Sequence, residues 1–388
     1  MIGARHKRAM PVRVATFNVE NLLARFDFSG WRREMRRDRT LALVDIRSKD
    51  QFRALEQARV VAHADDTRQM TALALADTDA DIVALQEVEN AETLDAFCDN
   101  YLERMFALRY EERHVVEGND TRGIDVALLA RRTARDGTPI EVLQVRSNAH
   151  LTYDHLGLHD AELAAIGVEA GDRVFRRDLL EVDLRVGGRR ATLYLAHFKS
   201  MGPWRDGVPG RTWTRPIRHA EAAAARAVIE RRFGERTPDM RWLVLGDLND
   251  YRERLVVTGS RLSGRSFEAV EDRPSGLEPL FDDGFSENLV ARRPADDRWT
   301  LFHAGGPERD GGAPQERATQ HSVQLDYILA SPRVARANVD AVPDILRAGQ
   351  PHRTPFPPGQ TVERYPRTGW DRPKASDHCP VAVTLDFV

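Results

Sequence analysis

Short apolar runs recur along the chain, and polar residues directly follow most of them. Because these runs are about four to eight residues long and rich in Val, Ile and Leu, they are typical of strands buried within layered sheets. Gly187-Gly188 joins two of the runs, which predicts a hairpin. The runs span residues 12–17, 81–86, 124–129, 140–145, 179–186, 191–196, 242–245, 324–329 and 381–387.

Helical periodicity separates several of these runs. Apolar residues recur at i, i+3, i+4 and i+7 after Asn90, which predicts an N-capped helix through Phe106. A helix is also predicted over residues 66–75, and another from the end of a loop at Pro216 through Phe233. Because helices and strands are mixed and hairpins imply antiparallel pairing, the pattern predicts an α/β or α+β fold with sheets covered by helices.

The chain of 388 residues shows no internal repeat and no composition break typical of a linker. We therefore predict a single domain over residues 1–388, with its core in 12–388 and insertions near 25–65, 252–320 and 341–375. The first insertion is dense in charge around Trp31 to Arg39. That segment is either a solvated helical face or a basic lid near the first strand.

Composition limits the class of protein. Hydrophobic residues make up 41% and charged residues 30%, which is enough for a large core in a soluble monomer. No apolar run reaches the length of a membrane span, so no membrane partner is expected. Two cysteines and no visible secretory signal predict a cytoplasmic protein without disulfides. A net charge of −3 argues against coating nucleic acid by charge alone, but it does not exclude a nuclease.

Polar side chains gather at or beside the strand ends. Asp247 and Asn249 follow a buried run, and their two-residue spacing lets both side chains face one target. If these ends converge, carboxylates and an amide would suit a hard cation, Mg²⁺ or Mn²⁺. Polar turns that only cap strands are the alternative. The set comprises Asn18, Glu87, His197, Asp247, Asn249, Asp326, Asp377 and His378.

Five short motifs around these residues resemble the ordered motifs of the endonuclease/exonuclease/phosphatase superfamily, whose fold is the deoxyribonuclease I-like one. The resemblance implies a four-layer sandwich, with two mixed β-sheets packed face to face and helices outside. It also implies a metal-dependent phosphoric ester hydrolase. The motifs are Thr16-Phe17-Asn18-Val19-Glu20-Asn21-Leu22, Leu85-Gln86-Glu87-Val88-Glu89-Asn90, Gly246-Asp247-Leu248-Asn249-Asp250, Leu325-Asp326-Tyr327-Ile328 and Ser376-Asp377-His378-Cys379-Pro380.

The resemblance implies a metal site. Glu87 matches the principal metal-binding glutamate, and Asn18 stands beside it. Asp377 would be a second carboxylate for the metal or its water network. The expected cofactor is Mg²⁺ or Mn²⁺.

The resemblance also implies catalytic roles for an in-line attack of water on a phosphoester. Asp247 matches the aspartate that positions or deprotonates the water, and Asn249 matches the amide that holds the phosphate. His378 matches the histidine that contacts the scissile phosphate, and Asp326 the carboxylate that orients it. His197 is a candidate acid for the leaving oxygen.

Three functions remain open at this stage. The first is a nuclease on DNA or RNA, with Trp204 and Trp213 offering faces for base stacking. The second is a phosphatase or phosphodiesterase of a small molecule or lipid head group, which the acidic balance favours. The third is a catalytically silent binding scaffold. The predicted phosphate contacts of the substrate are Lys199, Arg211, Arg218 and Arg122, although a loop pinned by the two tryptophans would explain several of them equally well.

Overall fold

Two six-stranded mixed sheets form the centre of the molecule. The computed structural model describes residues 11–22, 48, 51, 65–260, 262, 264–305 and 320–387. The first sheet has the order β15 (Asp344–Ile345), β16 (Val381–Asp386), β1 (Pro11–Leu22), β2 (Ile82–Val88), β4 (Asp125–Ala130) and β3 (Glu112–Val115). The second has the order β11 (Glu287–Asn288), β14 (Asp326–Ala330), β8 (Trp242–Asp247), β7 (Arg189–His197), β6 (Leu179–Val186) and β5 (Ile140–Arg146).

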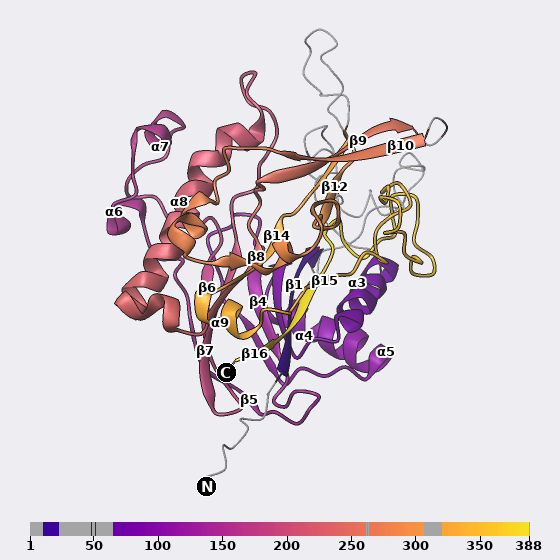
Figure 1. Ribbon diagram of the computed structural model, residues 1–388, viewed down its shortest axis with the longest axis horizontal. Helices are drawn as coiled ribbons and strands as arrows, with labels where there is room; N and C mark the ends of the chain where they lie inside the picture. Colours follow the sequence, from indigo (N-terminus) through magenta and orange to yellow (C-terminus); the bar gives the residue numbers. More distant parts are fainter. Residues whose placement is uncertain are drawn as a thin grey trace.

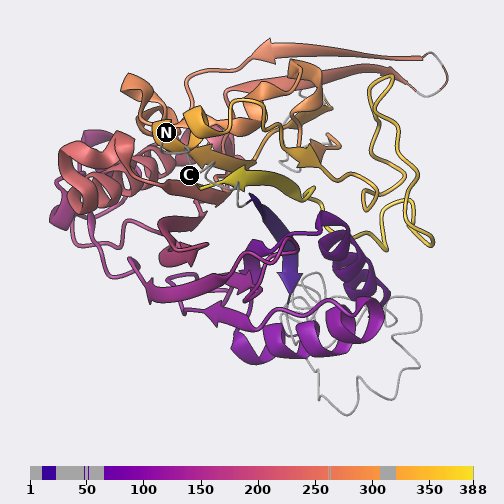
Figure 2. The same cartoon turned by 60° about the horizontal axis from the view of Figure 1, so that its bottom comes forward.

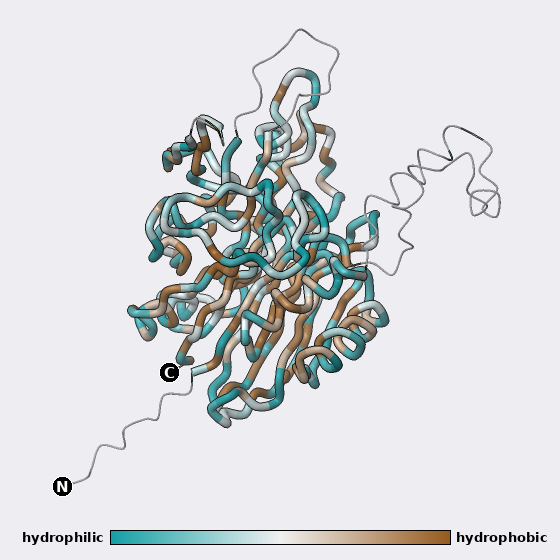
Figure 3. Tube along the Cα trace, turned by 90° about the vertical axis from the view of Figure 1, so that its right-hand side faces the viewer, coloured by the Kyte–Doolittle hydropathy of each residue, from teal (hydrophilic) through white to brown (hydrophobic). Residues whose placement is uncertain are grey.

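The two sheets pack face to face, and helices cover their outer faces. Inward residues such as Val14 of β1 and Leu245 of β8 belong to one buried cluster between the sheets. The outer face of the second sheet packs on α8 (Gly210–Phe233). The outer face of the first packs on α3 (Asp65–Thr78) and α4 (Ala91–Phe97). Figure 1 shows these helices on opposite flanks of the strands, and Figure 3 shows the apolar residues concentrated along the strands. The four-layer sandwich is thus confirmed.

Strand register positions the polar residues. β1 and β2 are parallel, and so are β7 and β8, which aligns His197 with Asp247 at the ends of two neighbouring strands. β14 runs antiparallel to β8, so that its first residue, Asp326, lies opposite Asp247. The start of β14 and the ends of β7 and β8 therefore meet at one place.

The helix α8 begins earlier than the sequence predicts. The expected loop extends to Pro216, but the helix starts at Gly210 and contains this proline. Arg211 and Arg218, on either side of Pro216, both bind Asp250, at 2.7 and 2.9 Å. These tertiary ion pairs hold the helical turns on both sides of the proline.

The predicted insertion at 252–320 contains strands that the sequence pattern missed. β9 (Glu253–Ser260) and β10 (Gly264–Glu271) form a hairpin, which joins β13 (His321–Val323) and β12 (Leu301–His303) in a four-stranded sheet. Figure 2 shows this hairpin extending from the body of the molecule. Residues on both faces of β10 are largely exposed, so its sequence lacks the alternation that reveals a strand.

Shorter elements complete the described part of the chain. The predicted helix after Asn90 is confirmed, because α4 continues through a π-helical turn, Cys98–Glu103, into α5 (Arg104–Phe106). The charged segment around Trp31 lies outside the described residues. None of the described helices combines the length and apolar character needed to cross a membrane. The remaining helices are α6 (Tyr153–Leu156), α7 (Ala161–Ala165), α9 (Pro332–Ala337) and the 3-10 segments Gly234–Asp239, Glu278–Leu280, Asp282–Gly284, Leu289–Arg292 and Ala295–Asp297.

Candidate active site

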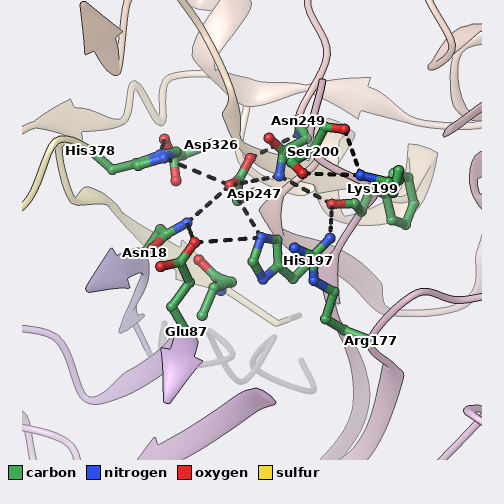
Figure 4. Close-up of polar contacts among 12 residues, drawn as sticks. Asn18, Glu87, Arg177, His197, Lys199, Ser200, Asp247, Asn249, Asp326 and His378 are labelled. Carbon is green, nitrogen blue, oxygen red and sulfur yellow. Dashed lines mark hydrogen bonds and ion pairs between the residues drawn. The ribbon is translucent and has the colours of Figure 1, made fainter. Parts of the chain in front are cut away.

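One oxygen of Asp247 lies at the centre of a buried polar cluster (Figure 4). Four side-chain nitrogens surround Oδ2, and they come from both sheets and from the loop before β16. The distances are 3.0 Å from Asn18 Nδ2, 2.9 Å from Asn249 Nδ2, 3.6 Å from His197 Nε2 and 3.7 Å from His378 Nε2. The predicted strand-end residues therefore converge between the two sheets.

The backbone around Asp247 is shaped for this convergence. Gly246 has a φ of 147°, and a Cβ there would lie 1.9 Å from the carbonyl oxygen of Ala196. Only glycine allows β7 and β8 to approach so closely. Asn249 has a left-handed φ of 52°, and its N–H donates to Asp247 Oδ1 at 2.8 Å. This tight turn aims the Asn249 amide back at the same carboxylate.

His378 is held as a cation. Its Nδ1 lies 2.8 Å from Asp326 Oδ2, and both side chains are buried. Burial alone would lower the pKa of His378, but the carboxylates of Asp326 and Asp247 raise it well above the ordinary value. Ser376 fixes the turn, because its hydroxyl accepts from the His378 N–H and donates to the Asn18 carbonyl.

His197 is neutral instead. Burial and then the charges of Arg177 and Arg122 lower its pKa well below the ordinary value. Its Nδ1 is buried without a hydrogen-bond partner among the described residues. A neutral imidazole is a hydrogen-bond donor or acceptor but a poor source of protons. This charge state does not fit the sequence-based prediction that His197 is the acid for the leaving oxygen.

Asp247 is the best-placed general base. Burial raises its pKa to about 7, although the nearby His378 charge works in the opposite direction. A carboxylate whose pKa lies near the working pH is suited to accept a proton from water. Its Oδ1 is occupied by the Asn249 N–H, so Oδ2 is the oxygen that faces the other groups.

Glu87 and Asp377 fit a divalent cation. Burial raises the pKa of the Glu87 carboxyl, and the negative charge of Asp377 raises it further. Two carboxylates that repel each other in a mostly buried place are stabilised by a positive ion between them. No cluster of three or more Asp, Glu, His or Cys side chains suited to a metal occurs within the described ranges. Although burial raises the pKa of Asp377, the charges of Lys374 and then His378 hold it below its ordinary value. Cation binding by the pair therefore stays a prediction, and its oxygen ligands would suit Mg²⁺ or Mn²⁺ better than zinc.

Asn18 positions the two carboxylates beside it. Its Oδ1 accepts the Glu20 N–H at 3.0 Å, and its Nδ2 points to Glu87 and Asp247. The backbone N–H of Glu20 requires the oxygen on that side, which still has a second lone pair. Asn18 thus acts as a donor to both carboxylates, and its role at the metal stays a prediction.

Sequence analysis missed the role of Glu20. This buried glutamate binds Lys374 at 3.0 Å and Arg372 at 2.6 Å, and it accepts the Asp377 N–H at 2.9 Å. It therefore ties β1 to the loop that carries Asp377 and His378. Its position in the Asn18-to-Leu22 motif was the only signal, because nothing in the sequence links it to Lys374.

The predicted phosphate contacts divide into two groups. Lys199 and Arg122 lie near His197, since the charge of each lowers its pKa. Arg218 has no exposed surface, and its guanidinium bonds to Asp250, Thr214 and backbone carbonyls. Arg211 is similarly occupied by Asp250 and Asp272. Neither Arg211 nor Arg218 is available as the phosphate contact that the sequence predicts.

Comparisons with known proteins bear on the family of this chain. The model of the Endonuclease/Exonuclease/phosphatase family matches residues 15–378. Comparison with curated protein sequences gives no match. Similar solved structures include a truncated TDP2 from Caenorhabditis elegans, at 13% identity over 97% of this chain and 98% of that chain, with a TM-score of 0.46. The human Nocturnin catalytic domain with bound sulfate anion has 13% identity over 98% and 96%, with a TM-score of 0.48.

The family match extends from the strand that carries Asn18 to His378 itself. Glu87, Asp247, Asn249 and Asp326 all lie within the matched range. Members of this family are phosphoric ester hydrolases and typically use a divalent metal. Because the match covers nearly the whole chain, this protein belongs to the endonuclease/exonuclease/phosphatase family.

Proposed function

We propose that this protein is a nuclease that hydrolyses phosphodiester bonds of DNA or RNA with Mg²⁺ or Mn²⁺. The observation that carries the proposal is the arrangement at Asp247, where a carboxylate with a raised pKa lies beside a cationic histidine. The pairing supplies a base for water and a positive charge for phosphate within 3.7 Å of each other. Polar residues that only cap strands would need neither a carboxylate with a raised pKa nor a charged histidine.

Each side chain has a defined task in this proposal. Asp247 orients the attacking water and accepts its proton. His378, held in place by Asp326, donates a charge-assisted hydrogen bond to a phosphoryl oxygen as negative charge grows there. The two amide hydrogens of Asn249 go to Asp247 Oδ2 and to the Phe198 carbonyl oxygen, so Asn249 holds the base in position and would bind a phosphoryl oxygen only by giving up one of these acceptors. Glu87 and Asp377 would hold the divalent cation, which supplies Lewis-acid stabilisation of the phosphate when bound.

A small-molecule phosphodiesterase is the second candidate. A cavity of about 820 Å³ beside Lys199 favours it, because this volume lies in the range of single-ligand pockets. Family membership counts against a silent scaffold.

The test is hydrolysis of plasmid DNA, single-stranded DNA, RNA and bis(4-nitrophenyl) phosphate, each with Mg²⁺, Mn²⁺ or EDTA. We expect metal-dependent cleavage of a polymer. Asp247→Ala and His378→Ala should each lower the rate by about 10³-fold or more while the circular dichroism spectrum is retained. Trp370→Ala, a change at an exposed tryptophan, is the control. Cleavage of the small ester alone would favour the second candidate. Near-wild-type activity in either variant would refute the assignment of Asp247 and His378.

A further inference from the structure

A large cavity lies directly beside the catalytic cluster, on the His197 side. Its volume is about 820 Å³, and its walls include Arg122, Arg177 and Lys199. The carbonyl oxygen of Phe198 lies between the two regions, because it accepts from Asn249 Nδ2 at 3.1 Å and from Arg177 Nη1 at 2.9 Å. The charges of three residues that line the cavity, Arg122, Arg177 and Lys199, also act on His197. The cavity is therefore adjacent to the cluster on the side of its neutral histidine.

The inner end of the cavity is positively charged. Lys199 Nζ donates to the carbonyl and hydroxyl oxygens of Ser200, and no carboxylate in the described part of the chain forms an ion pair with it. Burial and then the charge of Arg177 lower the pKa of Lys199, which shows how closely the two cations are placed. Asp120 compensates Arg177 and Arg122 together, at 2.8 and 3.1 Å. The charged residues that line the cavity are two carboxylates, Asp120 and Asp172, and five cations, Arg122, Arg176, Arg177, Lys199 and Arg205. Buried Glu221, which is not part of the wall, adds a third negative charge that acts on Arg177 and Lys199. Cations therefore remain in excess, which favours an anionic ligand.

The outer end of the cavity is aromatic. Trp204 contributes to the wall and is 40% exposed. Trp213 also lines the cavity, but the guanidinium of Arg205 covers its ring at 4.8 Å. Arg205 and Val208 exchange backbone hydrogen bonds at 3.0 and 2.9 Å, so the loop that presents Trp204 is a closed turn. An exposed indole on an ordered turn is a ready surface for a planar ring.

We propose that this cavity binds a nucleoside of the substrate, with its base stacked on Trp204 and its phosphate directed toward Lys199 and the catalytic cluster. The proposal rests on the proposed nuclease function and names the part of the substrate that this chain recognises. A base would stack on the aromatic end, and a phosphate would pair with the cationic end. A cationic lipid head group would be repelled by the excess positive charge, and a sugar phosphate would have no ring to stack on the indole.

Two chromogenic esters with the same leaving group test the proposal. Thymidine 5′-(4-nitrophenyl phosphate) carries a base, whereas methyl 4-nitrophenyl phosphate does not. We expect the wild type to prefer the nucleoside ester in kcat/KM, and Trp204→Ala to reduce this preference by about tenfold. Trp204→Phe should retain most of the preference because it keeps a stacking face. Trp370→Ala should leave the preference unchanged, since that exposed tryptophan does not line the cavity.

Equal preference in the wild type and Trp204→Ala would overturn the proposal while leaving the phosphodiesterase function intact. Turnover of neither ester would refute the function instead, and binding would then decide the cavity. Calorimetry of thymidine 5′-monophosphate with the metal-loaded full chain gives this second readout. We expect about tenfold weaker binding to Trp204→Ala than to the wild type and to Trp370→Ala. Equal affinities, or no binding to the wild type, would overturn the proposal.

Discussion

His378 and His197 approach the same oxygen of Asp247 from two sides, yet they differ in charge (Figure 4). Their Nε2 atoms are 3.7 and 3.6 Å from Oδ2, so distance to Asp247 does not distinguish them. His378 has Asp326 on its other nitrogen, which raises its pKa. The Nδ1 of His197 has no such partner in the described structure, and burial and then the charges of Arg177 and Arg122 lower its pKa.

The difference shows that the residues on the side of each histidine away from Asp247 determine its charge. On the His378 side, carboxylates hold one fixed positive charge that can stabilise a phosphoryl oxygen. On the His197 side, the positive charges already belong to Arg177, Arg122 and Lys199, and a further cation there would be unfavourable. The cluster therefore has a half with a charged imidazole, to which we assign the chemistry, and a half with a neutral imidazole, to which we assign substrate binding.

The largest effect is expected from removing the charge that holds His378 protonated. Asp326→Asn keeps the shape and an acceptor for Nδ1 but loses the negative charge, and we expect kcat to fall by about 10³- to 10⁴-fold at pH 7. Because Asp326 raises the pKa of His378, its loss lowers that pKa. The protonated, active form is then lost at lower pH, so the alkaline limb of the kcat/KM profile should move to lower pH.

The pH profile separates this explanation from a merely damaged site. In Asp326→Asn, activity should recover in part as the pH is lowered at constant metal concentration, because loss of the Asp326 charge also lowers the pKa of Asp247 and keeps this base ionised at lower pH. A uniform loss at every pH, with the limb unmoved, would contradict the assigned charge of His378. Thermal unfolding of both proteins serves as the control for folding.

The next effect should be on stability. It should show that Arg218 serves the fold and neither half of the cluster. Arg218 and Asp250 are fully buried and joined at 2.9 Å. Arg218→Met leaves the Asp250 charge with less compensation, and we expect the free energy of unfolding to fall by about 3–5 kcal/mol. Urea denaturation measures this loss. KM at a temperature where the variant is folded should stay near the wild-type value, and a large rise in KM without destabilisation would make Arg218 a substrate contact.

The pattern of the chain predicted mixed sheets covered by helices and polar residues at the strand ends, whereas the family resemblance predicted the four-layer arrangement. Asp247, Asp326 and His197 each stand at a strand boundary, and strand pairing alone brings them together. The same local reasoning failed for the predicted phosphate contacts, because the sequence does not distinguish Arg211 from Lys199. What separates them is Asp250, which pairs with Arg211 at 2.7 Å only after α8 has packed on the second sheet.

Orientation was a further limit of the sequence. Asn18 stands beside Glu87 as predicted, but the left-handed backbone at Glu20, with a φ of 51°, turns a backbone N–H toward the Asn18 oxygen. β10 was missed for another reason, since exposure on both of its faces removes the two-residue period that marks a strand, and its partner β9 buries only Leu255 and Val257. Both features depend on tertiary contacts or on solvent, and neither leaves a local pattern.

The smallest effect is expected at His197, and it decides between a neutral donor and an acid. His197→Gln places a neutral amide near the position of Nε2 and has no titratable proton, whereas His197→Ala removes the group. If the neutral form acts by donating a hydrogen bond, we expect Gln to lose less than about tenfold in kcat and Ala to lose about 10- to 100-fold. An acid would make the two variants equally poor. The comparison uses bis(4-nitrophenyl) phosphate and an alkyl-leaving-group substrate such as a dinucleotide, because only the alkoxide needs a proton in order to leave. Equal losses confined to the dinucleotide would restore His197 as the acid and would contradict the neutral charge state that its cationic neighbours impose.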